Sequence, residues 1–354
     1  MTLQMRRFRR ATAVGAAATM IGLSAYFVGA QSGTVDSAVN AAFSKYQNLQ
    51  EGKNADYIPV LAKVDPKLYG IAIVTPDGKV HTAGDVNTQV SIQSISKVFT
   101  MARVIQDQGP EAIEKRIGVD ATGMKFNSIV SVELIQKTGG GGEMNPLVNP
   151  GAITATSMVQ GKTPDEVWNK IIGTYSDFAG RRLTVLQDVY KSESETNERN
   201  KAIGMLMKAY GYIKDDPMQA VDLYTRQCSV GVNAKDLAMM AATLAFGGRN
   251  PVTGKQAISS ENVPHVLAVM ATAGLYDDSG KWLYHTGLPA KSGVGGGIIA
   301  VSPGKFGIAV VSPPLDDAGN SVRAQRAIRD INMALGGNPY AVKARTATAT
   351  NNNQ

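Results

Sequence analysis

The feature that most constrains the fold of this chain is the position of its strand patterns, which lie near both chain ends and leave a long helical middle. Near the start, residues 68–75 (LYGIAIVT) and 79–83 flank Pro76-Asp77-Gly78, a turn sequence typical of a hairpin. Near the end, residues 297–302 (GIIAVS) and 306–312 (FGIAVVS) flank a second Pro-Gly turn. Strand hairpins at both ends predict one sheet assembled from the two ends of the chain.

Helical patterning fills the space between these hairpins. Apolar residues recur at helical spacing in 36–48, 94–108 and 322–335, and the middle of the chain, about 110–273, is mostly helical and broken by polar loops. Its clearest helices are predicted at 164–175, 200–212 and 234–246. We therefore expect a helical lobe beside the sheet, and small-molecule sites tend to lie in clefts between such lobes.

Composition excludes two classes of protein. The chain has 354 residues, of which 44% are hydrophobic, enough for one large domain or two lobes with a sizeable core. Its single cysteine, Cys228, excludes an internal disulfide framework and a multi-cysteine zinc site. The three histidines, His81, His265 and His285, are far apart in sequence and give no helical pair of metal ligands.

The first 30 residues have the organisation of a signal peptide. Four arginines, the last of them Arg10, precede the uncharged, alanine-rich run 11–30, which ends in a small-x-small cleavage pattern before Gln31. Cleavage removes four of the 36 basic residues and leaves 32 against 29 acidic ones, so the net charge falls from +7 to +3. No long basic run remains, which gives little support to nucleic-acid binding.

An uncleaved membrane anchor is the alternative, because about 20 uncharged residues can just span a bilayer. The run is rich in Ala, Gly and Thr rather than Leu and Ile, which weakens it as a span. We favour export to the periplasm or the medium with cleavage, and thus no stable membrane association. The mature domain is then expected at 31–338, followed by a tail at 339–354 that is predicted to be disordered because its end (ARTATATNNNQ) is polar and low in complexity.

The candidate chemistry begins with an S-x-x-K motif, Ser94 to Lys97, at the start of a predicted helix. The three-residue spacing puts the hydroxyl and the amine on one helix face, one turn apart. The positive end of the helix dipole favours an alkoxide over an ammonium, and burial or a second cation would favour a neutral, basic amine. The alternative is a helix cap with a solvated lysine. A second copy, Ser302 to Lys305, lies in the strand turn near the end and is interpreted as turn chemistry.

A second element, Lys291-Ser292-Gly293, precedes further glycines and a predicted strand. In serine acyl-transfer enzymes of the S-x-x-K type, a K-[ST]-G element lines the cleft from a sheet edge, and nearby backbone N–H groups can hold an oxyanion. These glycines could instead form a plain turn, and a phosphate loop is disfavoured because a strand follows rather than a helix. Lys137-Thr138-Gly139 opens another glycine run, but no strand pattern follows it, and we interpret it as a flexible loop.

Several blocks in order resemble the serine-dependent bacterial glutaminases, relatives of β-lactamases and penicillin-binding proteins, from about Val39 to Leu335. The blocks are SIQSISKVF (91–99), NPLVN (145–149) with GAI (151–153), SE (192–193) with RN (199–200), YTRQCSV (224–230), GLYD (274–277) and GLPAKSGV (287–294). The resemblance implies a mixed α/β (α+β) fold of the β-lactamase/transpeptidase-like type, with an antiparallel sheet built from both chain ends, flanking helices and a helical lobe.

The same resemblance implies roles for individual residues. Ser94 is the expected nucleophile and Lys97 its base, and Lys97, Tyr224 or Tyr276 would protonate the departing ammonia. The implied substrate-binding residues are Ser94, Asn145, Glu193, Asn200, Tyr224, Tyr276 and Val294, with Lys291, Ser292 and Gly293 supporting them. Because free glutamine carries an ammonium and a carboxylate, Glu193 could hold the ammonium, while Asn200 and Tyr224 could donate to the carboxylate or position the amide.

Structural roles are the alternative for four of these pocket residues. Asn145 precedes a proline and could be a turn residue, the two tyrosines could pack in the core, and Glu193 could be solvated. Pro150, where we expect alanine in the family, removes an N–H group and fixes φ, which puts the shape of the pocket in question. Cys228 is disfavoured as a nucleophile because no histidine is near it in sequence.

The implied reaction is hydrolysis of L-glutamine to L-glutamate and ammonia through a γ-glutamyl ester of Ser94, with the N–H groups of Ser94 and Val294 holding the oxyanion. The resemblance implies no metal or organic cofactor, and a homo-oligomer, either a dimer or a tetramer. Two rivals remain open at this point. One is an exported β-lactamase or D-alanyl-peptide hydrolase, and the other is a non-catalytic envelope protein that binds an amino acid or peptidoglycan.

Overall fold

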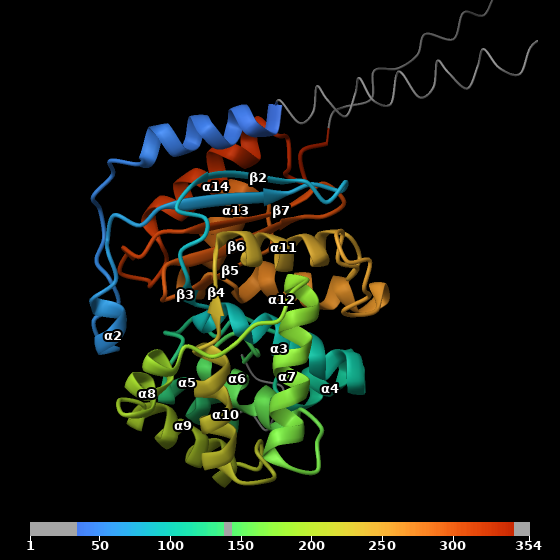
Figure 1. Ribbon diagram of the computed structural model, residues 1–354. Coiled ribbons are helices and arrows are strands. Elements are labelled where there is room, and N and C mark those ends of the chain that lie inside the picture. Colours follow the sequence, from blue (N-terminus) through green and yellow to red (C-terminus); the bar gives the residue numbers. More distant parts are fainter. Residues whose placement is uncertain (1–33, 138–143, 343–354) are drawn as a thin grey trace, which may run out of the picture.

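The computed structural model describes residues 34–137 and 144–342. The expected signal peptide, the glycine run after Lys137 and the end of the predicted tail, 343–354, lie outside the described residues. A sheet with helices on both faces packs against a region made of helices alone, as Figure 1 shows. This arrangement confirms the predicted helical lobe beside a sheet. Among the described residues, no helix has both the length and the hydrophobicity that crossing a membrane requires.

The main sheet has five antiparallel strands in the order β2-β1-β7-β6-β5. β1 (Gly70–Val74) and β2 (Val80–Gly84) come from the start of the chain. β5 (Ala290–Gly293), β6 (Gly297–Ser302) and β7 (Phe306–Val311) come from its end. The pairing of β1 with β7 joins the two sets and confirms that both chain ends build one sheet.

The side chains of the central strands alternate between two separate cores. In β1, Ala72 and Val74 face the helical region, whereas Ile71 and Ile73 face the opposite layer. β6 and β7 divide their side chains in the same way. Because helices cover both faces, every residue of these three strands is buried, and their sequences are almost continuously apolar.

Helices cover the two faces of the sheet in different ways. The described part of the first helix, 34–46, packs with α13 (Ser279–Thr286) and α14 (Val322–Ala334) on one face. α11 (Ala234–Ala245) and α12 (Val263–Ala273) lie on the other, where α11 makes the most extensive contact with β7.

The close approach of α11 explains a glycine in the middle of β7. A Cβ atom on Gly307 would lie 2.0 Å from the backbone nitrogen of Ala242, so no side chain can be accommodated there. The helix therefore rests directly on the sheet backbone.

The helical region begins with α3 and holds most of the remaining long helices. Its members are α3 (Ser96–Gln108), α4 (Pro110–Arg116), α5 (Ile129–Lys137), α6 (Asn149–Met158), α7 (Pro164–Ala179), α8 (Gln187–Ser194), α9 (Glu198–Ala209) and α10 (Pro217–Cys228). α7, α9 and α11 confirm the three clearest helices predicted from periodicity. The short elements are α2 (Pro59–Ala62), η1 (Gln93–Ile95), η2 (Ser260–Asn262), η3 (Tyr276–Asp278), β3 (Val90–Ser91) and β4 (Gly231–Val232).

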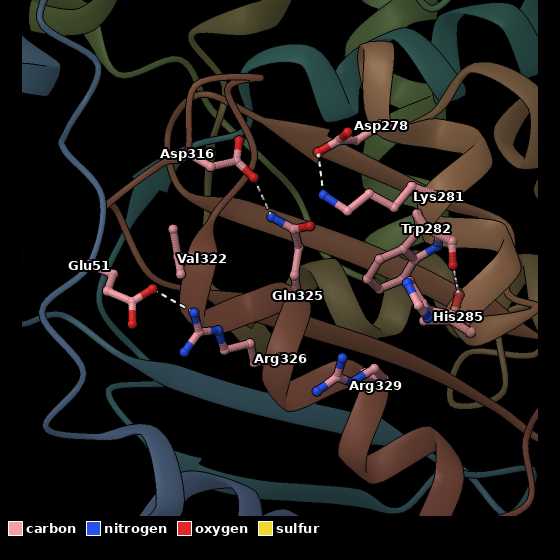
Figure 2. Close-up of a pocket in the computed structure, with 11 residues that line it drawn as sticks. Glu51, Asp278, Lys281, Trp282, His285, Asp316, Val322, Gln325, Arg326 and Arg329 are labelled. Atoms are coloured by element: carbon pink, nitrogen blue, oxygen red, sulfur yellow. Dashed lines mark hydrogen bonds and ion pairs between the residues drawn. The ribbon is translucent and has the colours of Figure 1, made fainter.

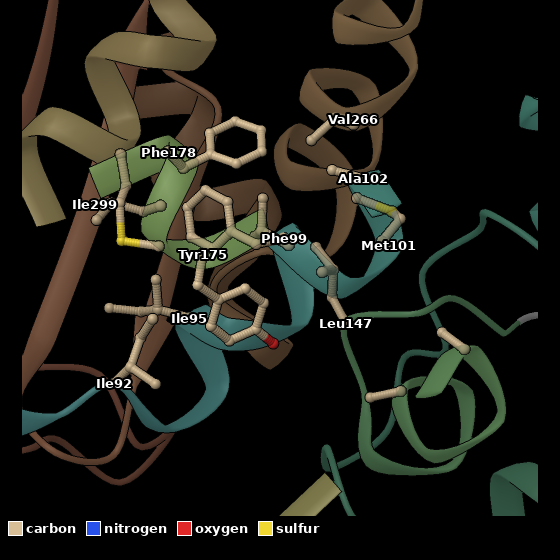
Figure 3. Close-up of a cluster of buried hydrophobic side chains, with 14 of the residues drawn as sticks. Ile92, Ile95, Phe99, Met101, Ala102, Leu147, Tyr175, Phe178, Val266 and Ile299 are labelled. Atoms are coloured by element: carbon tan, nitrogen blue, oxygen red, sulfur yellow. The ribbon is translucent and has the colours of Figure 1, made fainter. Parts of the chain in front are cut away.

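α3 runs through the main core, and aromatic side chains hold it in place (Figure 3). The Phe99 ring lies 4.9 Å from the Phe178 ring and 6.0 Å from the Tyr175 ring, measured between centroids. The Tyr175 hydroxyl also donates to the backbone oxygen of Ser96 at 2.9 Å. A hydrogen bond from a side chain of α7 therefore holds the first turn of α3.

A two-stranded sheet that the sequence did not reveal anchors the segment before α3. Val90 of β3 pairs with Val232 of β4, and the Ile92 nitrogen donates to the Val230 oxygen at 2.8 Å. Strands of two residues are too short to leave a periodic pattern, so the sequence gives no sign of them.

Candidate active site

Ser94 lies in η1 and Lys97 in the first turn of α3, so the predicted S-x-x-K motif spans the junction of a 3-10 turn and a helix. The Lys97 Nζ atom is 2.8 Å from Ser94 Oγ. Both side chains are buried, with relative exposures of 1% for Lys97 and 6% for Ser94. The structure thus brings the two groups together as a hydroxyl and an amine in direct contact, the arrangement of a nucleophile and its base.

Burial lowers the pKa of Lys97 from its usual value near 10.5 to about 8, while Cys228 and Glu193 act in the opposite direction. A second hydrogen bond, 2.8 Å from Nζ to Asn149 Oδ1, orients the amine. Since this oxygen can only accept, it takes an amine hydrogen and leaves the lone pair of the neutral amine for the Ser94 proton. Lys97 can therefore act as a general base near neutral pH.

Asn149 is a residue of this site that the sequence analysis did not assign. Its Oδ1 atom also accepts from the Tyr224 hydroxyl at 3.0 Å, and its Nδ2 atom donates to Asn200 Oδ1 at 2.9 Å. Three residues implied by the resemblance, Lys97, Tyr224 and Asn200, thus meet at one amide. Pro150 follows in the first turn of α6. Backbone N–H groups in the first turn have no acceptor within the helix, so a proline there removes no helical hydrogen bond and leaves Asn149 in place.

Glu193, near the end of α8, is 7% exposed and accepts a hydrogen bond from Gln93 Nε2 at 3.1 Å. Burial raises the pKa of Glu193 to about 7, although Gln93 and Lys97 lower it. A buried carboxyl group of this kind is stabilised as an anion by a cationic ligand, which suits an α-ammonium.

Gln93 is a second residue that the sequence analysis did not assign. Its φ angle is +48°, in the left-handed region that non-glycine residues rarely adopt. Its side chain donates to Ser91 Oγ at 3.2 Å as well as to Glu193. Strained backbone beside a nucleophile is typical of functional sites, but a backbone angle leaves no signature in sequence.

Lys291 of β5 is fully buried and faces the same site. Its Nζ atom donates to the backbone oxygens of Gly274 at 2.9 Å and Ser292 at 2.7 Å, and it lies 4.0 Å from the centre of the Tyr276 ring. The Tyr276 hydroxyl donates to the same Ser292 oxygen at 3.3 Å, and the Ser94 hydroxyl is close enough to act on the pKa of Tyr276. Burial raises the pKa of Tyr276 to about 12, so its proton stays in place beside the nucleophile. Burial, with the charge of Lys97, lowers the pKa of Lys291 well below its usual value.

The turn after β5 carries Val294 close to the segment that precedes Ser94. A Cβ atom on Gly293 would lie 2.9 Å from the Ile92 oxygen, and one on Gly295 would lie 2.6 Å from the backbone oxygen of the serine in β3. The glycines on both sides of Val294 therefore permit this approach. Within the described residues, no hydrogen bond from the Val294 N–H is present. An N–H group without a hydrogen-bond partner in this turn is available to a ligand oxygen.

Asn145 makes two hydrogen bonds from the loop before α6, as its interpretation as a turn residue expects. Its Nδ2 atom donates to the Asp120 oxygen at 2.8 Å, and its Oδ1 atom accepts from the Leu147 nitrogen at 2.9 Å. Both ends of the amide thus hold the loop before α6. No hydrogen bond joins Asn145 to Ser94 or Lys97 in the parts of the chain that the structure describes.

Cys228 is buried at the end of α10, with its Sγ atom 3.9 Å from Ser96 Oγ. Burial raises the pKa of this thiol to about 12. A thiol that stays protonated near neutral pH is a poor nucleophile.

A cavity of about 740 Å³ opens beside this site, and its lining includes Tyr276 and Val294. Tyr57, Lys125 and Phe126 also line it, and the Phe126 ring lies 4.9 Å from the Tyr276 ring. Pockets of this size hold small molecules.

A second pocket, of about 320 Å³, lies between α13 and α14 (Figure 2). Its polar side chains are largely paired with one another, as in Arg326 with Glu51 at 2.5 Å and Gln325 with Asp316 at 2.8 Å. Its lining includes no residue of the predicted site, whereas Tyr276 and Val294 line the larger cavity, and Ser94 and Lys97 line neither.

Known proteins resemble this chain over most of its length. The family model described as Glutaminase matches residues 52–340, which include the whole candidate site. A glutaminase of Colwellia psychrerythraea (strain 34H) is 53% identical over 310 residues, covering 88% of this chain and 98% of the relative. The solved structure of "Probable glutaminase ybaS" has a TM-score of 0.85 at 45% identity, covering 88% of this chain and 99% of the other. That of "Probable glutaminase from Bacillus subtilis complexed with 6-diazo-5-oxo-L-norleucine" has a TM-score of 0.74 at 28% identity, covering 84% and 93%.

Proposed function

The chain belongs to the glutaminase family, and from this premise we propose that Ser94 and Lys97 catalyse hydrolysis of the side-chain amide of L-glutamine to L-glutamate and ammonia. The observation that carries the assignment of these two residues is the 2.8 Å contact between Lys97 Nζ and Ser94 Oγ in a fully buried setting. The mixed fold with its antiparallel sheet is that of the solved glutaminases.

In the first step, neutral Lys97 takes the Ser94 proton while Oγ bonds to the side-chain carbonyl carbon of glutamine. The negative charge that develops on the carbonyl oxygen is held by the backbone N–H groups of Ser94 and Val294. The carbon–nitrogen bond then breaks, and the leaving nitrogen receives a proton so that ammonia departs.

Of the two tyrosines, Tyr276 has the better position to relay this proton from the Lys97 ammonium. Tyr276 lines the cavity beside the site, whereas Tyr224 is not among the residues that line it. Water, deprotonated by Lys97, then cleaves the γ-glutamyl ester, releases glutamate and restores Ser94.

Recognition of free glutamine needs partners for both of its charges. Glu193 would bind the α-ammonium, because a cation restores the charge that burial opposes in this carboxyl group. Asn200 and Tyr224 would bind the other polar groups of the substrate. Asn145 would act indirectly, by holding the loop that carries Asn149.

The test is the release of ammonia and glutamate from L-glutamine by purified residues 31–354, with Ser94→Ala and the matched control Ser302→Ala. We expect turnover in the wild type and the control, and its loss in Ser94→Ala. Turnover that survives in Ser94→Ala would contradict the assignment of the nucleophile.

Asparagine and a chromogenic cephalosporin are assayed in parallel to test the two rival functions. Hydrolysis of the cephalosporin without hydrolysis of glutamine would favour a β-lactamase or D-alanyl-peptide hydrolase. Binding of glutamine to folded protein without turnover of any substrate would favour an amino-acid-binding envelope protein.

Export is a separate part of the proposal and rests on the N-terminal sequence. The basic start, the alanine-rich run and the small-x-small pattern support a signal peptide cleaved before Gln31. Intact-mass analysis of cell fractions is expected to find a chain that begins at Gln31 outside the cytoplasm. A full-length chain in the membrane fraction would support an uncleaved anchor instead.

Self-association into a dimer or tetramer is also proposed. Val130 of α5 and Met205 of α9 are 57% and 56% exposed on two helices that contact each other, and large exposed apolar side chains are often covered by a partner. Sedimentation velocity of the mature protein is expected to give the mass of a dimer or tetramer, and a monomer at micromolar concentration would contradict this.

A further inference from the structure

We propose that Ser279 is a positioning residue that holds the Tyr276 hydroxyl beside Ser94 by fixing the backbone on both sides of Tyr276. Ser279 is the first residue of α13 and directly follows η3, which contains Tyr276. It is 3% exposed and lines neither of the two cavities described above. The inference rests on the proposed function and adds to it a residue that acts on the reaction through Tyr276.

The backbone of Tyr276 has a conformation that needs support. Its φ angle is +54°, in the left-handed region, where the Cβ atom of an L-residue comes close to the following carbonyl oxygen. Among the described residues, Tyr276 shares a positive φ with Gln93 and otherwise only with glycines. A tyrosine side chain, unlike that of asparagine, has no polar atom close enough to its own backbone to stabilise this angle. Strained angles of this kind persist only where surrounding contacts hold them.

The Ser279 hydroxyl supplies two such contacts. Its Oγ atom accepts a hydrogen bond from the Leu275 nitrogen at 3.0 Å and donates one to the Tyr276 oxygen at 2.8 Å. A hydroxyl has a single proton, so the donated bond fixes the direction of that proton and leaves a lone pair for the Leu275 N–H group. The hydroxyl thus joins the peptide group before Leu275 to the one after Tyr276, and it restrains the rotation of both residues.

This restraint decides where the two neighbouring side chains lie. Leu275 packs in the core with α13 and α14, whereas Tyr276 lines the larger cavity. Asn320 donates to the Leu275 oxygen at 3.3 Å and holds the peptide group between the two residues. If the φ angle of Tyr276 relaxed to a negative value, its side chain would leave the backbone in another direction. The hydroxyl would then lose its 3.3 Å hydrogen bond to the Ser292 oxygen and its place near Ser94.

Contacts with the Tyr276 ring are a separate source of support. The ring lies 4.9 Å from the Phe126 ring and 4.0 Å from Lys291 Nζ. Both contacts act on the ring, and a contact with the ring does not set the backbone angle. They remain unchanged in the variants below, so a substitution at Ser279 reports on the backbone of Tyr276.

The experiment is a double-mutant cycle of Ser279→Ala and Tyr276→Phe, with kcat for glutamine measured in all four proteins. Tyr276→Phe alone is expected to lower kcat about 100-fold or more, because the proton relay is lost. In the presence of Tyr276, Ser279→Ala should lower kcat about 10- to 100-fold, because the hydroxyl is displaced. In Tyr276→Phe there is no hydroxyl to position, so Ser279→Ala should change kcat by less than about twofold.

The matched control is Ser176→Ala on α7. The Ser176 hydroxyl also donates to a backbone oxygen, that of Ile172 at 2.7 Å, and accepts from a backbone nitrogen, that of Leu183 at 3.1 Å. Both serine variants lose two hydrogen bonds and should lower the melting temperature, but Ser176→Ala should keep the wild-type kcat. If Ser279→Ala does not fold, Ser279→Cys takes its place. A thiol is a weaker donor of similar size, so we expect the same dependence on Tyr276.

An equal fall in kcat with and without the Tyr276 hydroxyl would show a general disruption of the fold and overturn this inference. Wild-type kcat in a folded Ser279 variant would overturn it as well. Either result leaves the proposed function intact, because every protein in the cycle retains Ser94 and Lys97. Glutaminase activity that survives in Ser94→Ala would instead overturn the proposed function, so the two failures are distinguishable.

Discussion

The chain contains the sequence S-x-x-K twice, and the two copies differ in local structure, in the burial of the lysine and in the contact between the two side chains. Ser94 and Lys97 lie at the start of a helix, are buried and contact each other at 2.8 Å. Ser302 and Lys305 lie on either side of the β6–β7 turn. The Ser302 hydroxyl donates to the Gly337 oxygen at 2.7 Å, and the exposed Lys305 amine donates to the Gly336 oxygen. The second copy closes a turn and holds the chain after α14.

This comparison shows that burial and helical spacing, rather than the motif, produce the chemistry. Removal from water lowers the pKa of Lys97 to about 8, and the helix brings its amine to the hydroxyl one turn away. An exposed lysine in a turn keeps its hydration and has no geometric reason to meet the serine. The four predictions below test this difference, beginning with the largest expected effect.

Replacing Lys97 with methionine is expected to lower kcat about 10³- to 10⁴-fold, because the general base is lost. The same change should stabilise the protein. The unfolded chain binds the Lys97 proton more tightly than the folded chain does, since the folded pKa of about 8 lies below 10.5. Stability therefore rises with pH between about 8 and 10.5, and below pH 8 the burial cost is present in full, up to about 3 kcal/mol.

Lys305→Met is the matched control for this prediction and should leave kcat unchanged. Chemical denaturation at pH 7 compares the two variants with the wild type. A less stable Lys97→Met protein would contradict the lowered pKa.

Replacing Gly295 with alanine is expected to lower kcat about 100-fold. The new Cβ would lie 2.6 Å from a backbone oxygen of β3, so the turn must move and carry the Val294 N–H away from the oxyanion. Gly304→Ala, in the turn of the second motif, has no atom within 4 Å of its new Cβ but has a φ of +70°. It should cost about 1 kcal/mol of stability and no activity. Equal kcat values for the two variants would refute the placement of Val294.

Replacing Glu193 with glutamine is expected to raise KM for glutamine about 10- to 100-fold, because one hydrogen bond between charged groups is lost. In the wild type, KM should rise as pH falls below about 7, because Glu193 takes up a proton and no longer attracts an ammonium. The variant should lose this pH dependence. A KM that still rises below pH 7 in Glu193→Gln would assign that titration to another group.

Replacing Ser302 with alanine is the smallest change and tests the turn motif alone. The expected cost is about 1 kcal/mol of unfolding free energy from the lost hydrogen bond to Gly337, with kcat and KM unchanged. Thermal unfolding and a glutamine assay measure both. A large loss of activity would show that the second motif takes part in the chemistry.

The sequence predicted the parts of this molecule that depend on local pattern. Periodicity gave the strands of both hairpins and the long helices, and the spacing of Ser94 and Lys97 gave their contact, because a helical turn is a local structure. Asn149 was missed because its partners are 52 and 75 positions away in the chain, and no local pattern records such contacts. The positive φ of Gln93 was missed because a backbone angle leaves no signature in sequence, and β3 and β4 were missed because strands of two residues leave no periodic pattern.

The most direct test of the central claim is to find which residue a glutamine-like electrophile labels. The compound 6-diazo-5-oxo-L-norleucine, present in the Bacillus subtilis glutaminase structure, carries a diazoketone at the end of an α-amino acid. The hydroxyl proton of the nucleophile passes to the diazo carbon, the hydroxyl oxygen bonds to that carbon, and its carbon–nitrogen bond breaks to release dinitrogen. After incubation, peptide mapping by mass spectrometry is predicted to find one label, on Ser94, and none in Lys97→Met. A label on Cys228, on Ser302 or on no residue of inactivated enzyme would contradict the account.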